Sequence, residues 1–176
     1  MGARAYDRIA ILLHWVVGLA ILLQFALGWR VGSIPESEAA QWVELHQSFG
    51  IVLVAFVVVR LLWRLSHPAP ELPGTLPRLQ RTMAKATHWA LYGCMVLMPV
   101  SGYLGSSSAK DPVKLFGFPL PPFSWNSPEL QDAMGLVHGI TAWLLGALVA
   151  LHVAAALYHL VRRDGIFSRM WSAERG

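Results

Sequence analysis

Four long apolar stretches dominate this 176-residue sequence, and they limit what the chain can fold into. They are residues 9–29, 45–63, 86–109 and 133–161, and Arg60 is the one charged residue within them. About 20 apolar residues in a helix cross a bilayer, and a helix satisfies its own backbone hydrogen bonds there. We therefore expect an all-α integral membrane four-helix bundle. It forms one domain over residues 1–176, with helices at about 8–30, 44–65, 80–106 and 129–163.

The charged residues predict the orientation of the bundle. They make up 14% of the chain, against about 25% in soluble domains. Eleven of the fourteen basic residues lie before the first stretch, at the end of the second stretch or between it and the third, or after the fourth. The positive-inside rule then places the N and C termini in the cytoplasm, with the chain crossing the membrane as a multi-pass protein. Because topology explains the net charge of +4, lipid is an expected partner and nucleic acid is not.

The first stretch also resembles a signal peptide, since basic residues precede it. Its apolar run is long for that purpose, and no small-residue cleavage pattern follows it before Arg30. We expect it to be a retained membrane helix.

Six histidines fall within these stretches, where ionisable groups are costly and usually functional. On the predicted topology two lie in the outer half of the membrane and four in the inner half. The outer histidines are His46 and His138; the inner ones are His14, His88, His152 and His159. A seventh, His67, lies in a polar connection and is expected to be solvated. Packing of the histidines through hydrogen bonds between helices is the alternative without a cofactor.

Spacing and chemistry favour haem as the group that these histidines bind. On a helix, His138, His152 and His159 share one face because they are 14 and 7 residues apart. Two neutral imidazoles form an axial pair for haem iron, whereas structural zinc uses four ligands. The single Cys94 and the lack of C-x-x-C-H indicate haem held without covalent links. We expect two haem b groups.

The residues alone leave part of the assignment open. The outer haem takes His46 and His138, and the inner haem takes His152 with either His14 or His88. Arg60 lies fourteen residues after His46 and can pair with a haem propionate, or extend to the cytoplasmic surface. A histidine-lined metal or proton transporter is the alternative of another class, although proton relays usually include acidic residues within the helices.

The chain resembles the bacterial cytochrome b561 family over essentially its whole length, and this resemblance implies a location in the bacterial inner (plasma) membrane. The resemblance rests on LLHW, ELHQSFG, THWALY and H-x13-H-x6-H, one in each stretch in chain order. It implies a di-haem b cytochrome whose outer iron is bound by His46 and His138 and whose inner iron is bound by His14 and His152. His88 is then left without iron.

The resemblance also implies an oxidoreductase that takes electrons from superoxide, or another periplasmic donor, and passes them to ubiquinone. His159 is then the residue expected at the quinone, and outer basic residues are expected at the superoxide entrance. Three basic residues (Arg30, Lys110 and Lys114) face six acidic ones on that side, so superoxide chemistry requires the three to cluster.

The main alternative is an electron-transfer subunit that links quinone to a separate dehydrogenase or reductase. The long connection before residue 128 carries four prolines among aromatic residues. We expect it to lie on the outer membrane surface, where it can also bind such a partner.

Overall fold

The computed structural model describes residues 6–68, 70, 76–109, 113–122 and 126–171. Four long helices account for most of these residues: α1 (Arg8–Ser33), α2 (Glu36–Ser66), α3 (Arg78–Ser107) and α4 (Pro128–Arg162). A two-stranded antiparallel sheet, β1 (Lys114–Leu115) and β2 (Phe118–Pro119), lies between α3 and α4, and a short 3-10 helix, η1 (Phe167–Met170), follows α4. The expected all-α architecture with four helices is confirmed.

The second helix begins eight residues earlier than the apolar pattern predicts. It starts at Glu36, directly after Pro35, and two residues separate it from the end of α1. Pro35 has no N–H to donate to a preceding helical turn, so α2 begins directly after it. The carboxylates of Glu36 and Glu38 are stabilised by the positive end of the helix dipole. The polar first turns of α2 therefore extend beyond the apolar stretch, which marks the membrane-crossing part and not the whole helix.

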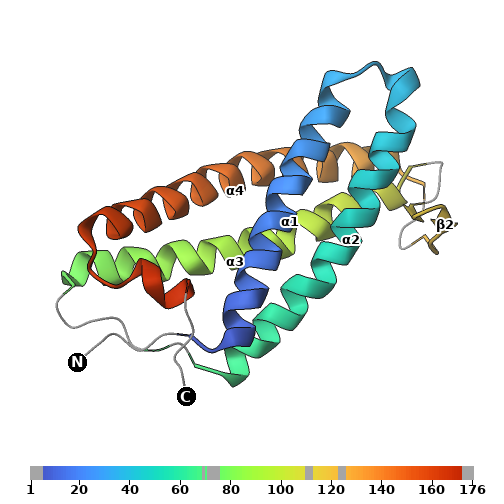
Figure 1. Cartoon of the computed structure of the whole chain (residues 1–176). Coiled ribbons are helices and arrows are strands. Elements are labelled where there is room, and N and C mark those ends of the chain that lie inside the picture. Colours follow the sequence, from blue (N-terminus) through green and yellow to red (C-terminus); the bar gives the residue numbers. More distant parts are fainter. Residues whose placement is uncertain (1–5, 69, 71–75, 110–112, 123–125, 172–176) are drawn as a thin grey trace.

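The helices pack as two antiparallel pairs. Figure 1 shows α1 beside α2 and α3 beside α4, with one pair crossing the other. The buried core at the crossing takes side chains from all four helices: Val17, Ile21, Val57, Cys94 and Leu145. A cavity lined by residues of both pairs lies between them and holds part of the candidate site.

The outer surface of the bundle is apolar. Within the described residues, α1, α2 and α4 are long and apolar enough to cross a membrane, and between 11% and 17% of their most apolar windows is buried. Large side chains such as Trp143 and Val161 are exposed on α4. α3 is less apolar on average because its first turns carry Arg78, Gln80, Arg81 and Lys85. Exposed apolar surface of this extent fits a bundle surrounded by lipid.

Three separate segments meet at one end of the bundle. The buried Arg169 donates to the carbonyl of Pro70 at 2.6 Å, and its own carbonyl accepts from the N–H of Tyr6 at 3.2 Å. Trp15 donates from its indole to the carbonyl of Met170 at 2.9 Å. The beginning of α1, the segment after α2 and the segment after α4 therefore lie together, as the charge pattern predicts. Arg4 and Arg175, which contribute to that pattern, lie outside the described residues.

A β-hairpin closes the opposite end. Ser48, which is fully buried, donates to the carbonyl of Lys114 at 3.3 Å and accepts from the N–H of Phe116 at 2.9 Å. Phe116 and Gly117 both have positive φ angles, as a two-residue hairpin turn requires. The proline-rich sequence predicted a surface loop and gave no indication of this hairpin, since its strands are two residues long.

We predict that Ser48→Ala loosens the hairpin. The N–H of Phe116 loses its partner, at a cost of about 1–3 kcal/mol. The unfolding temperature in detergent should fall, and a protease should cleave residues 113–122 faster. Ser33→Ala is the control because the hydroxyl of Ser33 is exposed and bonds within its own helix turn. Equal cleavage rates in the two variants would contradict this role of Ser48.

Candidate metal centres

His46 of α2 and His138 of α4 face each other in the outer half of the bundle. Their ring centroids are 6.1 Å apart, and the ring planes are inclined by 81°. A ligating imidazole nitrogen lies about 2 Å from its metal and about 1 Å from its own ring centroid, so two axial imidazoles on one iron have centroids about 6 Å apart. The pair predicted from the sequence is thus brought together at the spacing that an iron between the rings requires.

The surroundings of His138 fix its tautomer. Its Nδ1 lies 3.0 Å from the carbonyl of Met98, so Nδ1 carries the hydrogen and Nε2 keeps its lone pair for a metal. A Cβ on Gly102, one turn further along α3, would lie 3.0 Å from Cε1 of His138. The hydrogen bond and the glycine together hold this ring against α3.

His46 has a similar setting on α1. A Cβ on Gly28 would lie 3.4 Å from Cε1 of His46, and Gln24 donates from Nε2 to the His46 carbonyl at 3.0 Å. Among the described residues, Nδ1 of His46 and Oε1 of Gln24 are buried without a hydrogen-bond partner. A ligating imidazole usually donates its other ring N–H to an oxygen, and these two unpartnered atoms belong to residues that the Gln24 hydrogen bond already joins.

A cavity of about 2520 Å³ lies between the helix pairs at this level. His46, His138 and Gly102 line it, as does Lys114 from the hairpin. Sites for drug-sized ligands occupy roughly 300–1,000 Å³, so the cavity has room for a macrocycle between the two imidazoles. The residues present therefore fit a haem group at the outer site.

Three histidines gather in the inner half. The ring centroid of His152 lies 5.9 Å from that of His14 and 5.4 Å from that of His88. His14 and His152 are half-buried, whereas His88 is exposed and its Nδ1 donates to the carbonyl of Ala84 at 2.6 Å. Both candidates for the second inner ligand are within range, and the 5.9 Å of His14 is nearer to the spacing of two axial imidazoles.

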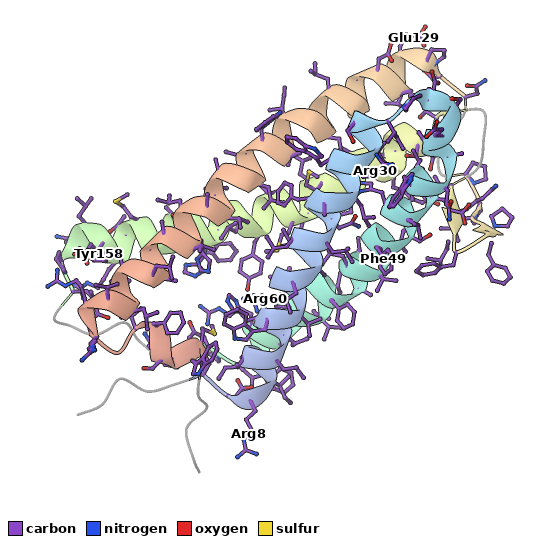
Figure 2. The ribbon with its side chains drawn as sticks, turned by 45° about the horizontal axis from the view of Figure 1, so that its top comes forward. Arg8, Arg30, Phe49, Arg60, Glu129 and Tyr158 are labelled. Carbon is purple, nitrogen blue, oxygen red and sulfur yellow. The ribbon has the colours of Figure 1, made fainter. Side chains whose placement is uncertain are left out.

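Arg60 lies at the depth that its spacing from His46 predicts. Figure 2 shows its side chain pointing from α2 into the bundle. Its Nη2 is 3.0 Å from Nδ1 of His14. Because a guanidinium can only donate, Nδ1 accepts here and the hydrogen of a neutral His14 is on Nε2. Iron bound at Nε2 therefore requires Arg60 to leave Nδ1, and a carboxylate is the partner that would draw it away.

His159 lies near the end of α4, seven residues or about 10 Å beyond His152. Its Nδ1 is 2.6 Å from Oδ2 of Asp164, and the two side chains are 16% and 29% exposed. His67 does not join these residues, because its exposed ring stacks on Trp63 at 4.0 Å.

Within the described residues, three or more His, Cys, Asp or Glu side chains do not come together in a group that could hold a metal ion. A catalytic or structural zinc site takes at least three protein ligands. Pairs of imidazoles suit haem, in which the macrocycle supplies the other four ligands.

Sequence reasoning did not single out Gly28 and Gly102, although a spacing could have revealed them. Each helix carries two site positions fourteen residues apart: His14 and Gly28, His46 and Arg60, His88 and Gly102, His138 and His152. Fourteen residues return to nearly the same face of a helix. Every helix therefore places one residue at the level of the outer histidine pair and one at the level of the inner histidines.

Comparison with known proteins identifies relatives over nearly the whole chain. Residues 5–173 match the family model described as prokaryotic cytochrome b561. Cytochrome b561 homolog 2 of Escherichia coli (strain K12) is 34% identical over 170 residues, which cover 94% of this chain and 90% of that protein. Probable superoxide oxidase CybB of Yersinia pestis is 25% identical over 174 residues, which cover 98% and 99%.

We predict that Gly102→Ala disturbs the outer site alone. The added Cβ would lie too close to the His138 ring, so haem per polypeptide should fall below the wild-type value. Gly93→Ala is the matched control on the same helix, because a Cβ there meets nothing within 4 Å. Haem extraction with a pyridine spectrum gives the stoichiometry. Full haem in Gly102→Ala with an unchanged spectrum would show that the His138 ring does not need its close approach to Gly102.

Proposed function

Because the chain belongs to the prokaryotic cytochrome b561 family, whose members are haem b membrane bundles that transfer electrons, we propose that it conducts electrons across the bacterial inner membrane through two haem b groups. The observation that carries this proposal is the pair of facing imidazoles at each of two levels. The ring centroids lie 6.1 Å and 5.9 Å apart. The levels are separated by fourteen residues of α4, about 21 Å.

In this proposal, His46 and His138 hold the outer haem, and His14 and His152 hold the inner one. Haem with two histidine ligands supplies one-electron transfer and leaves no open iron position, so substrates react at its edge. Arg60 leaves Nδ1 of His14 and binds an inner propionate, where its planar fork matches a carboxylate. His88 borders the inner site without binding iron.

All four helices cross the membrane with both termini in the cytoplasm. Support comes from the clustering of the segments before α1, after α2 and after α4 at one end, where most of the basic residues lie. The hairpin end, with His46 and His138, then faces the periplasm.

Superoxide is the proposed electron donor at the periplasmic side. One relative carries the name of a probable superoxide oxidase, and Lys114 lines the outer cavity. A cation there raises the local concentration of a small anion. Arg30 does not join Lys114 at the cavity: its guanidinium lies over the ring of Trp42 at 5.2 Å, and Glu36 and Glu44 line the cavity instead. Lys110 lies outside the described residues, so the expected cluster of three basic residues is not seen in the described part of the chain, and the proposal rests on Lys114. Each superoxide gives up one electron and leaves as O₂.

Ubiquinone is the proposed acceptor, at the cytoplasmic end near His159. Its reduction to ubiquinol takes two electrons, hence two superoxide ions, and two protons. The half-buried His159 reaches solvent with 16% of its side chain, and an imidazole there can act as a general acid that passes protons to the quinone.

A pure electron-transfer subunit for a separate dehydrogenase or reductase is the second candidate. The exposed Phe116 and Phe118 at the hairpin tip favour it, because aromatic residues are enriched where proteins dock. Superoxide-dependent quinone reduction by the purified chain alone would exclude this role as the sole one.

We predict two haem b groups per chain and separable losses of each. His46→Ala or His138→Ala should leave one haem, as should His14→Ala or His152→Ala, because each pair serves one level. His88→Ala is the matched control and should keep both. Absorbance spectra and haem stoichiometry of the purified variants test this. A colourless wild-type protein would favour the transporter alternative, and loss of haem in His88→Ala with full haem in His14→Ala would exchange the two assignments.

We predict that Lys114→Ala slows superoxide oxidation several-fold in kcat/KM and weakens its dependence on ionic strength. Arg30→Ala removes the same charge on the same side but outside the cavity, so it should have a smaller effect. Pulse radiolysis that follows haem reduction by superoxide measures both rates. Equal effects of the two substitutions would show that Lys114 acts only through the net charge of that side of the protein.

A further inference from the structure

We propose that Asp164 is a positioning residue for His159, and that it fixes which ring nitrogen of His159 serves the quinone. The proposal rests on the proposed function, in which the quinone lies beside His159. The contact itself is short: Oδ2 of Asp164 lies 2.6 Å from Nδ1 of His159.

The turn after α4 is shaped to bring this carboxylate back onto the helix. Arg163 adopts a left-handed conformation with φ of 53°, and Gly165 follows with φ of 83°. A positive φ at a residue other than glycine is uncommon and strained. Asp164, between them, uses Oδ1 to accept from the N–H of Ile166 at 3.2 Å. One oxygen thus holds the turn while the other holds the histidine.

The carboxylate is ionised under working conditions. Partial burial by itself raises the pKa of Asp164. Hydrogen bonds from His159 and from the N–H of Ile166, with the charges of His159 and Arg162, outweigh that effect, so the pKa lies below its ordinary value. An ionised carboxylate can only accept, so Nδ1 of His159 carries a hydrogen and Nε2 is the free nitrogen.

This arrangement suits the protonation of a quinone. When the ring is protonated on both nitrogens, Nε2 gives its proton to a quinone oxygen, and Nδ1 keeps its bond to Asp164. Nε2 then regains a proton from water on the cytoplasmic side, and the step occurs twice for each ubiquinol, which also takes up the two electrons given by two superoxide ions in the proposed function. Asp164 stays ionised throughout and balances the charge of the protonated ring, as the orienting acid does in a catalytic triad.

A purely structural role for Asp164 predicts different behaviour. In that case its loss would weaken the turn, lower thermal stability and act independently of His159. Asp164→Asn separates the two roles. Its amide oxygen can still accept from the N–H of Ile166, but its NH₂ would face Nδ1, make that nitrogen an acceptor and remove the charge.

The experiment uses the purified protein with haem bound and chemically reduced. Stopped-flow reoxidation by a water-soluble ubiquinone analogue gives kcat and KM for wild type, Asp164→Asn, His159→Ala and the double variant. Asp164→Asn should lower kcat roughly tenfold to a hundredfold, the range for residues that orient a functional histidine, with little change in KM. The double variant should be no slower than His159→Ala, because the two residues act as one unit.

Asp7→Asn is the matched control, since Asp7 caps α1 at the same end of the bundle and accepts from the N–H of Ala10. It should keep the wild-type rate. If Asp164→Asn loses haem or stability, Asp164→Ser takes its place, because a serine hydroxyl can still close the turn.

The outcomes separate the two proposals. A wild-type rate in Asp164→Asn beside a slow His159→Ala overturns the role of Asp164 and leaves the quinone site in place. A wild-type rate in His159→Ala overturns the quinone site itself. Additive losses in the double variant also overturn the positioning role, since they show that Asp164 acts without His159.

Discussion

The facing of two imidazoles across the bundle is the contact on which the rest of the arrangement depends. A histidine in lipid needs a polar partner or a metal, and here each partner comes from a different helix pair. α4 presents His138 and His152 fourteen residues apart on one face. α1 and α2 run antiparallel, so His14 meets α4 at the inner level and His46 meets it at the outer level. The two helix pairs cross (Figure 1), and His46 and His138 line the cavity between them.

The rings are positioned as much by backbone as by side chains. His138 lies against α3 because a carbonyl accepts from its Nδ1 and Gly102 has no Cβ to obstruct it. His46 lies against Gly28 of α1 in the same way. α3 contributes no iron ligand in the proposed assignment, yet its carbonyl and glycine decide where a ligand from α4 points. A helix can thus shape a metal site without providing a ligand, because a glycine on it leaves room for a ligating ring.

The helices, the outer histidine pair and the inner cluster around His152 could be predicted from the sequence, because apolar length and helical spacing are local properties. The early start of α2 could not, since hydropathy reports the membrane-crossing part of a helix and ignores polar turns beyond it. The bond between Ser48 and the hairpin joins residues far apart in the chain. The contact of Arg60 with His14 depends on the rotamer of the arginine side chain, which helical spacing does not determine. The carboxylate of Asp164 reaches His159 through two positive φ angles that no spacing rule covers.

That both levels draw an imidazole from α4 has a consequence for biogenesis. α4 is the last of these helices to leave the ribosome, so the earlier helices enter the bilayer with His14 and His46 still lacking the rings that face them. A pair able to hold iron from both sides exists only after the final span is inserted. Loading of cofactor is then a late event, and a chain truncated before residue 138 would have neither pair. In the proposed assignment, haem would therefore bind only after α4 has been synthesised and inserted.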